Sequence, residues 1–171
     1  MDEDVILNDS WTLFFHDPYD NDWSPSSYQR ICDIMSIQEF WETTQTLAGD
    51  VANGAFFLMR QDISPQWEDP SNVDGGTISI KVLKKEVVEV WEMLSMLLTG
   101  ESLMRDKKNY SAVNGISITP KKFFCVIKIW IGNKDMLQNV KDEMNFPSNY
   151  KGEYQVRQNK DGNLLEVGNI N

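Results

Sequence analysis

Short apolar segments with a two-residue alternation recur along this chain, and they constrain its fold more than any other feature. In the clearest one, residues 123–131, the alternation separates a wholly apolar face from a face that carries a lysine and a tryptophan. The two faces are Cys125, Ile127 and Ile129, and Val126, Lys128 and Trp130. The other predicted strands are Ser10–Phe15, Tyr28–Met35, Ala55–Arg60, Thr77–Val82, Ala112–Ile118 and Glu153–Gln158. Strands outnumber helices and short hairpin-like links dominate, which predicts the α+β class, an antiparallel sheet with helices on one face.

Helical segments are fewer, and their ends are marked by local signals. Ser36 and Glu39 form a capping-box pattern that predicts a helix to about Leu47. Apolar residues at helical spacing predict a second helix over Lys84–Thr99, with Gly100 as its stop. A third helix is predicted from the cap Asn133 to about residue 144.

Length and composition predict one globular domain. The chain has 171 residues, of which 41% are hydrophobic. We expect a single domain over residues 1–171, with residues 1–9 as a flexible arm. The acidic start is unlike a secretory signal, and no run reaches the ~18 apolar residues of a membrane span. The sequence therefore predicts an intracellular, cytoplasmic protein in which Cys32 and Cys125 are reduced, with a disulfide as the minor alternative.

Charge is distributed unevenly along the chain. The net charge is −10, but residues 1–104 carry −14 and residues 105–171 carry +4. So acidic a chain cannot hold long nucleic acid by its phosphates, because that mode needs many lysine and arginine contacts. If the protein binds RNA, it must read one end or one base. The basic C-terminal part suits a short phosphate chain, or is simply a solvated surface.

Catalytic motifs are absent from the sequence. The lone histidine, His16, lies in a Phe-His-Asp-Pro stretch that we expect in a loop, away from any triad. Residues 74–76 (Asp-Gly-Gly) lack the lysine that would complete a phosphate-binding loop. The sequence therefore predicts neither an enzyme nor a cofactor or metal site.

One tryptophan has surroundings that favour ligand binding. Trp67 lies in Pro65-Gln66-Trp67-Glu68-Asp69, whose flanking prolines and acids indicate a loop. A single tryptophan is usually a core residue, and we expect this of Trp11. A loop is a poor place to bury an indole, and Trp23, before Ser24-Pro25, has the same character. An indole next to a carboxylate can stack on a purine and accept hydrogen bonds from its edge.

Together, the spaced tryptophans and the strings around them resemble the cap-binding translation initiation factor 4E family. The resemblance runs from Trp11 to Tyr154, nearly the whole chain. Its strings are Trp11-Thr-Leu-Phe-Phe, Trp23, Ile37-Gln38-Glu39-Phe40-Trp41, Pro65-Gln66-Trp67-Glu68-Asp69, Gly75-Gly76, Leu97-Leu98-Thr99-Gly100-Glu101 and Ile129-Trp130. It implies a curved antiparallel sheet of about eight strands with three helices packed on the convex face, and a concave face that holds the 7-methylguanosine cap of messenger RNA.

The resemblance also implies the roles of individual residues toward the guanine. Trp23 and Trp67 match the tryptophans that sandwich the methylated base, whose positive charge an indole face attracts. Glu68 matches the carboxylate that accepts the N1 and N2 hydrogens, and Trp130 matches the tryptophan that contacts the N7 methyl. Adenine lacks those two donors together, so Glu68 is implied to supply base identity.

Phosphate contacts are where the chain departs from the family. The family's lysine before the last cap-facing tryptophan falls on Val126, and Lys128 on the same strand face is expected to replace it. Lys121 matches an arginine of the family, and two residues of the tail are expected to close over the second or third phosphate. The expected phosphate contacts are Lys121, Lys128, Arg157 and Lys160.

A second surface completes the resemblance. Ile37, Trp41, Trp91 and Gly100 match the convex patch that binds a Tyr-x-x-x-x-Leu-hydrophobic helix of a scaffold factor or repressor. The implied function is recruitment of capped messages to translation by a monomer that bridges cap and scaffold. Two alternatives stay open: a cap-binding repressor or decoy, and a protein interaction module that has lost cap binding.

Overall fold

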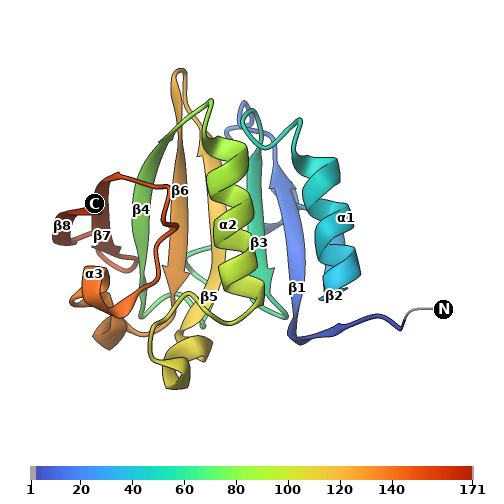
Figure 1. Ribbon diagram of the computed structural model, residues 1–171. Coiled ribbons are helices and arrows are strands. Elements are labelled where there is room, and N and C mark those ends of the chain that lie inside the picture. The colour runs from blue at the N-terminus through green and yellow to red at the C-terminus, as the bar shows by residue number, and fades with distance from the viewer. Residues whose placement is uncertain (1–2, 171) are drawn as a thin grey trace.

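The chain forms one curved antiparallel sheet with helices on one face in the computed structural model, which describes residues 3–170 (Figure 1). The sheet has eight strands in the order β2-β1-β3-β5-β6-β4-β7-β8. The strands are β1 Ile6–His16, β2 Gln29–Ser36, β3 Ala55–Arg60, β4 Gly76–Leu83, β5 Val113–Pro120, β6 Phe124–Ile131, β7 Gly152–Gln158 and β8 Leu164–Ile170. The helices are α1 Ile37–Leu47, α2 Val87–Thr99 and α3 Val140–Glu143, with 3-10 turns η1 Pro25–Ser27, η2 Lys107–Ala112 and η3 Lys134–Leu137. The predicted α+β class is confirmed.

The two faces of the sheet bury different sets of side chains. Ile127 and Ile129 of β6 are fully buried in the main core beneath the helices. Trp130 belongs instead to a smaller cluster with Phe57 and Met59 of β3 on the opposite face. The alternation predicted for residues 123–131 is therefore confirmed, and it leaves the face opposite the helices free to carry a site.

Both long helices begin and end for local reasons. The Ser36 side chain accepts a hydrogen bond from the Glu39 amide at 3.2 Å, and the Glu39 carboxylate accepts one from the Ser36 amide at 3.1 Å. This is the predicted capping box. Helix α2 ends at Thr99 before Gly100, as predicted, but begins at Val87, because residues 84–86 form a turn instead. None of the helices within residues 3–170 is long and apolar enough to cross a membrane.

Two expectations about the fold differ from the structure, and one strand was not predicted. The helix expected from Asn133 to residue 144 is broken into η3 and α3, because Asn139 takes a left-handed conformation with φ of 53°. Residues 6–9 of the expected flexible arm form the start of β1, and residues 1–2 lie outside the described residues. Strand β8 was missed because it is an edge strand whose largely exposed side chains give no apolar alternation.

Arg60, at the end of β3, links distant parts of the chain. Its guanidinium lies 4.4 Å from the ring centre of Trp11 and donates hydrogen bonds to Glu101 at 2.6 and 3.1 Å and to Asp9 at 3.0 Å. It also donates to the carbonyl oxygen of Val113 at 2.8 Å. The side chains of Arg60 and Glu101 are only 10% and 11% exposed. Breaking such a pair leaves a buried charge without its partner.

Replacing Arg60 with methionine should therefore lower the free energy of unfolding by about 3 kcal/mol. The matched control is Arg30→Met, because Arg30 pairs with Asp33 at the surface, where the two side chains are 63% and 42% exposed. Its loss should be below about 1 kcal/mol. Urea unfolding followed by tryptophan fluorescence measures both values, and equal losses would contradict the role of Arg60.

Candidate functional site

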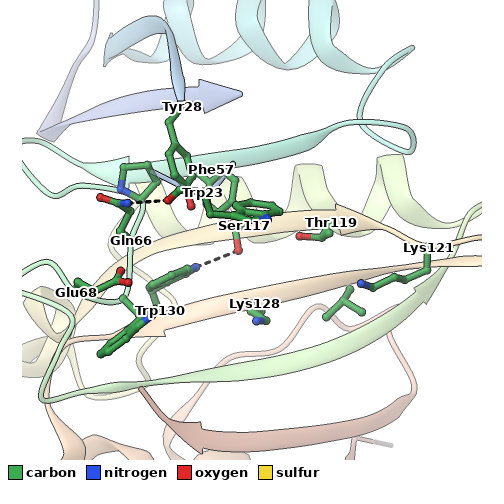
Figure 2. A pocket seen from close by; sticks show the side chains of 13 residues that line it. Trp23, Tyr28, Phe57, Gln66, Glu68, Ser117, Thr119, Lys121, Lys128 and Trp130 are labelled. Atoms are coloured by element: carbon green, nitrogen blue, oxygen red, sulfur yellow. Dashed lines mark hydrogen bonds between the residues drawn. The ribbon is translucent and has the colours of Figure 1, made fainter. Parts of the chain in front are cut away.

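A cavity of about 540 Å³ opens on the face of the sheet opposite the helices (Figure 2). Its floor comes from β5 and β6, and its upper walls come from the loops after β1 and β3. The lining residues are Trp23, Tyr28, Phe57, Pro65, Gln66, Trp67, Glu68, Ser117, Thr119, Lys121, Val126, Lys128 and Trp130. The structure thus brings residues that are more than a hundred positions apart in the sequence to one hollow.

Two tryptophans line the cavity from separate loops. Trp23 follows β1 and Trp67 follows β3, and their side chains are 47% and 43% exposed. Trp11, in contrast, is fully buried, as predicted. The Gln66 side-chain amide donates a hydrogen bond to the Trp23 carbonyl oxygen at 3.2 Å (Figure 2). The two loops are therefore held together, and both indoles keep surface available for a ligand.

The loop of residues 61–75, which carries Trp67, is anchored by a buried amide. Asn72 is fully buried, and its Nδ2 donates to the carbonyl oxygens of Ser64 at 3.2 Å and Gln66 at 2.8 Å. Its Oδ1 accepts a hydrogen bond from Asn114 of β5 at 2.9 Å. A satisfied polar network of this kind rigidifies the backbone it binds. The conformation of the loop is thus tied to the sheet.

Glu68 contributes an anionic group to the cavity. None of the ion pairs formed within residues 3–170 involves its carboxylate. Burial raises the pKa of the neighbouring Tyr28 to about 12, and the negative charge of Glu68 acts in the same direction. Tyr28 therefore stays neutral near pH 7. Because none of these ion pairs involves Glu68, its side-chain oxygens can accept hydrogen bonds from a ligand.

Trp130 forms a fixed part of the cavity floor. It is 7% exposed, and its indole N–H donates to the Ser117 hydroxyl at 3.0 Å (Figure 2). Because the hydrogen bond satisfies the only polar atom of the indole, the ring can present its apolar edge to a ligand.

Positive charge gathers at the end of the cavity away from Glu68. Figure 2 shows Lys128 on the floor and Lys121 beyond it, with Glu68 on the other side of Trp130. Desolvation, and then repulsion from Lys121 and Arg157, hold the pKa of Lys128 below its ordinary value. An anion bound beside Lys128 would relieve that repulsion.

The two tail cations lie outside this cavity. Arg157 of β7 donates to the carbonyl oxygen of Gly162 at 3.2 Å, close enough for its charge to act on Lys128. Lys160 lies 3.7 Å from Asp74 and lines a separate cavity of about 630 Å³. The structure therefore brings six of the eight predicted ligand contacts to one cavity, places Arg157 near it, and places Lys160 elsewhere.

The double glycine before β4 has a packing role. A Cβ on Gly75 would collide with the carbonyl group of Ile131, and one on Gly76 would collide with the carbonyl oxygen of Arg157. Only glycine lets the start of β4 approach both neighbouring strands this closely.

The predicted partner residues lie on the helix-covered side, with unequal exposure. Ile37 and Trp41 of α1 are 41% and 39% exposed, and Ile6 beside them is 70% exposed. Gly100 lines a surface cavity of about 430 Å³. Trp91 differs from expectation: it is 4% exposed, because it faces the core from α2. A partner helix can therefore reach Trp41 but little of Trp91.

Two features of the site were missed in the sequence. His16, expected in a loop, is the last residue of β1 and is fully buried behind Trp23. The pairing of Asn72 with Asn114 joins residues 42 positions apart. No spacing signal marks either of them, because each depends on how distant segments meet.

The arrangement suits one kind of ligand. Two exposed indoles can stack on a flat ring, and the carboxylate beside them can accept hydrogen bonds from that ring's edge. The lysines at the other end favour an anionic chain attached to the ring. Within residues 3–170, no group of three or more His, Cys, Asp or Glu side chains could hold a metal ion. The cavity has the features of a binding site for a nucleotide with an electron-poor base.

Comparison with known proteins gives a consistent family. The family model for eukaryotic initiation factor 4E matches residues 6–164. The eukaryotic translation initiation factor 4E of Candida glabrata is 29% identical over 143 residues, which cover 78% of this chain and 67% of that protein. The Saccharomyces cerevisiae factor is 26% identical over 136 residues, covering 75% and 62%. The chain thus spans 62–67% of the length of these two relatives.

Solved structures share the fold at lower sequence identity. One similar structure is the complex of Caenorhabditis elegans eIF4E-3 with the 4E-binding protein Mextli and cap analog. It has a TM-score of 0.78 and 17% identity, and the match covers 96% of this chain and 99% of that one. At this identity the likeness establishes the fold.

Replacing Asn72 with alanine should release the loop of residues 61–75. The change removes two donated hydrogen bonds and the acceptor of the buried Asn114 amide, so the free energy of unfolding should fall by about 2 kcal/mol. The control is Asn163→Ala at an exposed position, with an expected change within about 0.5 kcal/mol. Denaturant unfolding measures the difference, and an equally small effect of both changes would contradict the anchoring role.

Proposed function

Because this chain belongs to the eukaryotic initiation factor 4E family, we propose that its cavity binds the 7-methylguanosine cap at the 5′ end of messenger RNA. The observation that carries the proposal is the joint lining of one cavity by Trp23, Trp67, Glu68 and Trp130. The similar C. elegans protein is described in complex with a cap analog. The protein acts as a binding factor in the cytoplasm, without catalysis.

The proposed complex places the methylated guanine between Trp23 and Trp67. Methylation at N7 gives the base a delocalised positive charge, which the indole faces attract. Stacking on an aromatic ring contributes about 1–3 kcal/mol, and a desolvated cation–π contact about 2 kcal/mol. Glu68 accepts hydrogen bonds from the N1 and N2 groups of the base, and Trp130 contacts the N7 methyl. Selectivity for the methyl group therefore comes from the stack, and selectivity for guanine from Glu68.

The phosphates of the cap extend toward the basic end of the cavity. Lys128 and Lys121 are in position to bind them, with Arg157 close enough to Lys128 to add its charge. Lys121 and Arg157 repel the Lys128 ammonium group, and a bound anion would relieve that repulsion. Lys160, held near Asp74, would have to change partner to contribute.

On the opposite face, the exposed apolar patch supports a second interaction. We define the α1 patch as Val5, Ile6, Ile37 and Trp41, which are between 39% and 70% exposed. The amide of Ile37 donates to the carbonyl oxygen of Val5 at 2.8 Å, which fixes the N-terminal residues beside the helix. The patch would bind the amphipathic helix of a scaffold factor, so that the protein recruits capped messages to translation. If the α1 patch binds a repressor instead, the protein holds caps without recruiting the messages to translation and acts as a decoy.

Cap binding can be tested by tryptophan fluorescence with 7-methyl-GTP and GTP as ligands. We expect strong quenching by the methylated ligand only, because the two differ by the methyl group and its charge. Glu68→Gln should weaken binding at least tenfold, since charge-assisted hydrogen bonds contribute about 1.5–3 kcal/mol each. Glu89→Gln, on the exposed face of α2, is the control and should bind like the wild type. Equal quenching by both ligands, or none, would refute the cap assignment and leave the interaction-module alternative.

Partner binding can be tested with a peptide that contains the Tyr-x-x-x-x-Leu-hydrophobic motif. Trp41→Ala should weaken peptide binding at least tenfold, because central tryptophans often dominate an interface. Phe123→Ala removes a 72% exposed aromatic side chain on the β5–β6 hairpin and should leave peptide binding unchanged. A wild-type protein that binds the cap but no such peptide would favour the decoy.

A further inference from the structure

The lone histidine of the chain is stacked directly behind one of the two exposed indoles. His16 is fully buried at the end of β1, where it pairs with Ala55 of β3. Its ring centre lies 3.7 Å from that of Trp23, with an angle of 4° between the planes. The two rings are therefore in parallel face-to-face contact. One face of Trp23 is covered by the imidazole, which leaves the other face for the cavity.

Hydrogen bonding fixes the imidazole in this position. Nε2 of His16 lies 2.6 Å from the carbonyl oxygen of Asp22, the residue before Trp23. A carbonyl oxygen only accepts, so Nε2 carries the proton and donates. The Tyr28 ring packs against the same imidazole, with 5.1 Å between ring centres. His16 thus contacts the Trp23 ring by stacking and the backbone just before Trp23 by a hydrogen bond.

We propose that His16 is the positioning residue for Trp23 in cap binding. This inference rests on the proposed cap-binding function. The imidazole presents the indole as a preformed platform, so that less conformational freedom is lost when the base stacks. The resulting order of layers is imidazole, Trp23, methylguanine and Trp67.

The test compares the wild type with two variants at one pH near neutrality. His16→Phe keeps a flat ring behind Trp23, and His16→Ala removes that ring. The dissociation constant for 7-methyl-GTP is measured by fluorescence for each protein, and urea unfolding confirms that the variants are folded.

The positioning role predicts two results. His16→Phe should bind nearly as well as the wild type, because a flat ring still supports the indole. His16→Ala should bind about three- to tenfold more weakly than His16→Phe, because Trp23 loses its support and must be ordered when the base stacks.

Two other results would overturn the inference. Equal binding by folded His16→Ala and His16→Phe would show that the ring of residue 16 does not position Trp23. If the wild type does not bind 7-methyl-GTP, the cap-binding function itself fails, and the inference with it.

Discussion

Each strand of the sheet presents two surfaces, and the alternation between them is the constraint on which the rest of the molecule depends. Along β6, Ile127 and Ile129 enter the core beneath the helices, and Lys128 and Trp130 point to the cavity. A shift of one residue in the register of β6 would exchange the two sets. It would bury an ammonium group in the core, so the packing of the core specifies the placement of the site.

The cavity needs indoles that are exposed and yet well ordered, two requirements that oppose each other. Exposed aromatic side chains on loops gain little from burial, so their order must come from other contacts. Within the loop of residues 61–75, the Asn72 side chain donates a hydrogen bond to the carbonyl oxygen of Gln66 and accepts one from Asn114 of β5. Trp23 is stacked on His16. Both platforms are thus supported by buried polar groups that belong to the sheet or contact it.

The charge at one end of the cavity differs from that of the chain as a whole. The chain as a whole carries −10, which repels long nucleic acid, and the cavity nevertheless ends in Lys121 and Lys128. At Lys128 the nearby charges that act on the side chain are those of Lys121 and Arg157, opposite in sign to the net charge of the chain. A ligand with a short anionic chain can therefore be bound where an extended polyanion would be repelled. This matches the proposed recognition of a single cap rather than the body of a message.

The sequence by itself determined the features that depend on near neighbours. The capping box of α1, the two faces of β6, the buried Trp11 and the loop positions of Trp23 and Trp67 were all predicted, because periodicity and capping act over a few residues. The strings around Trp67 and Trp130 also indicated the family. Only the tertiary structure decided that Lys160 pairs with Asp74, that Trp91 is buried, and that residues 164–170 form the edge strand β8. It likewise placed His16 behind Trp23. These outcomes depend on which distant segments meet and in what register, and local spacing carries no record of such contacts.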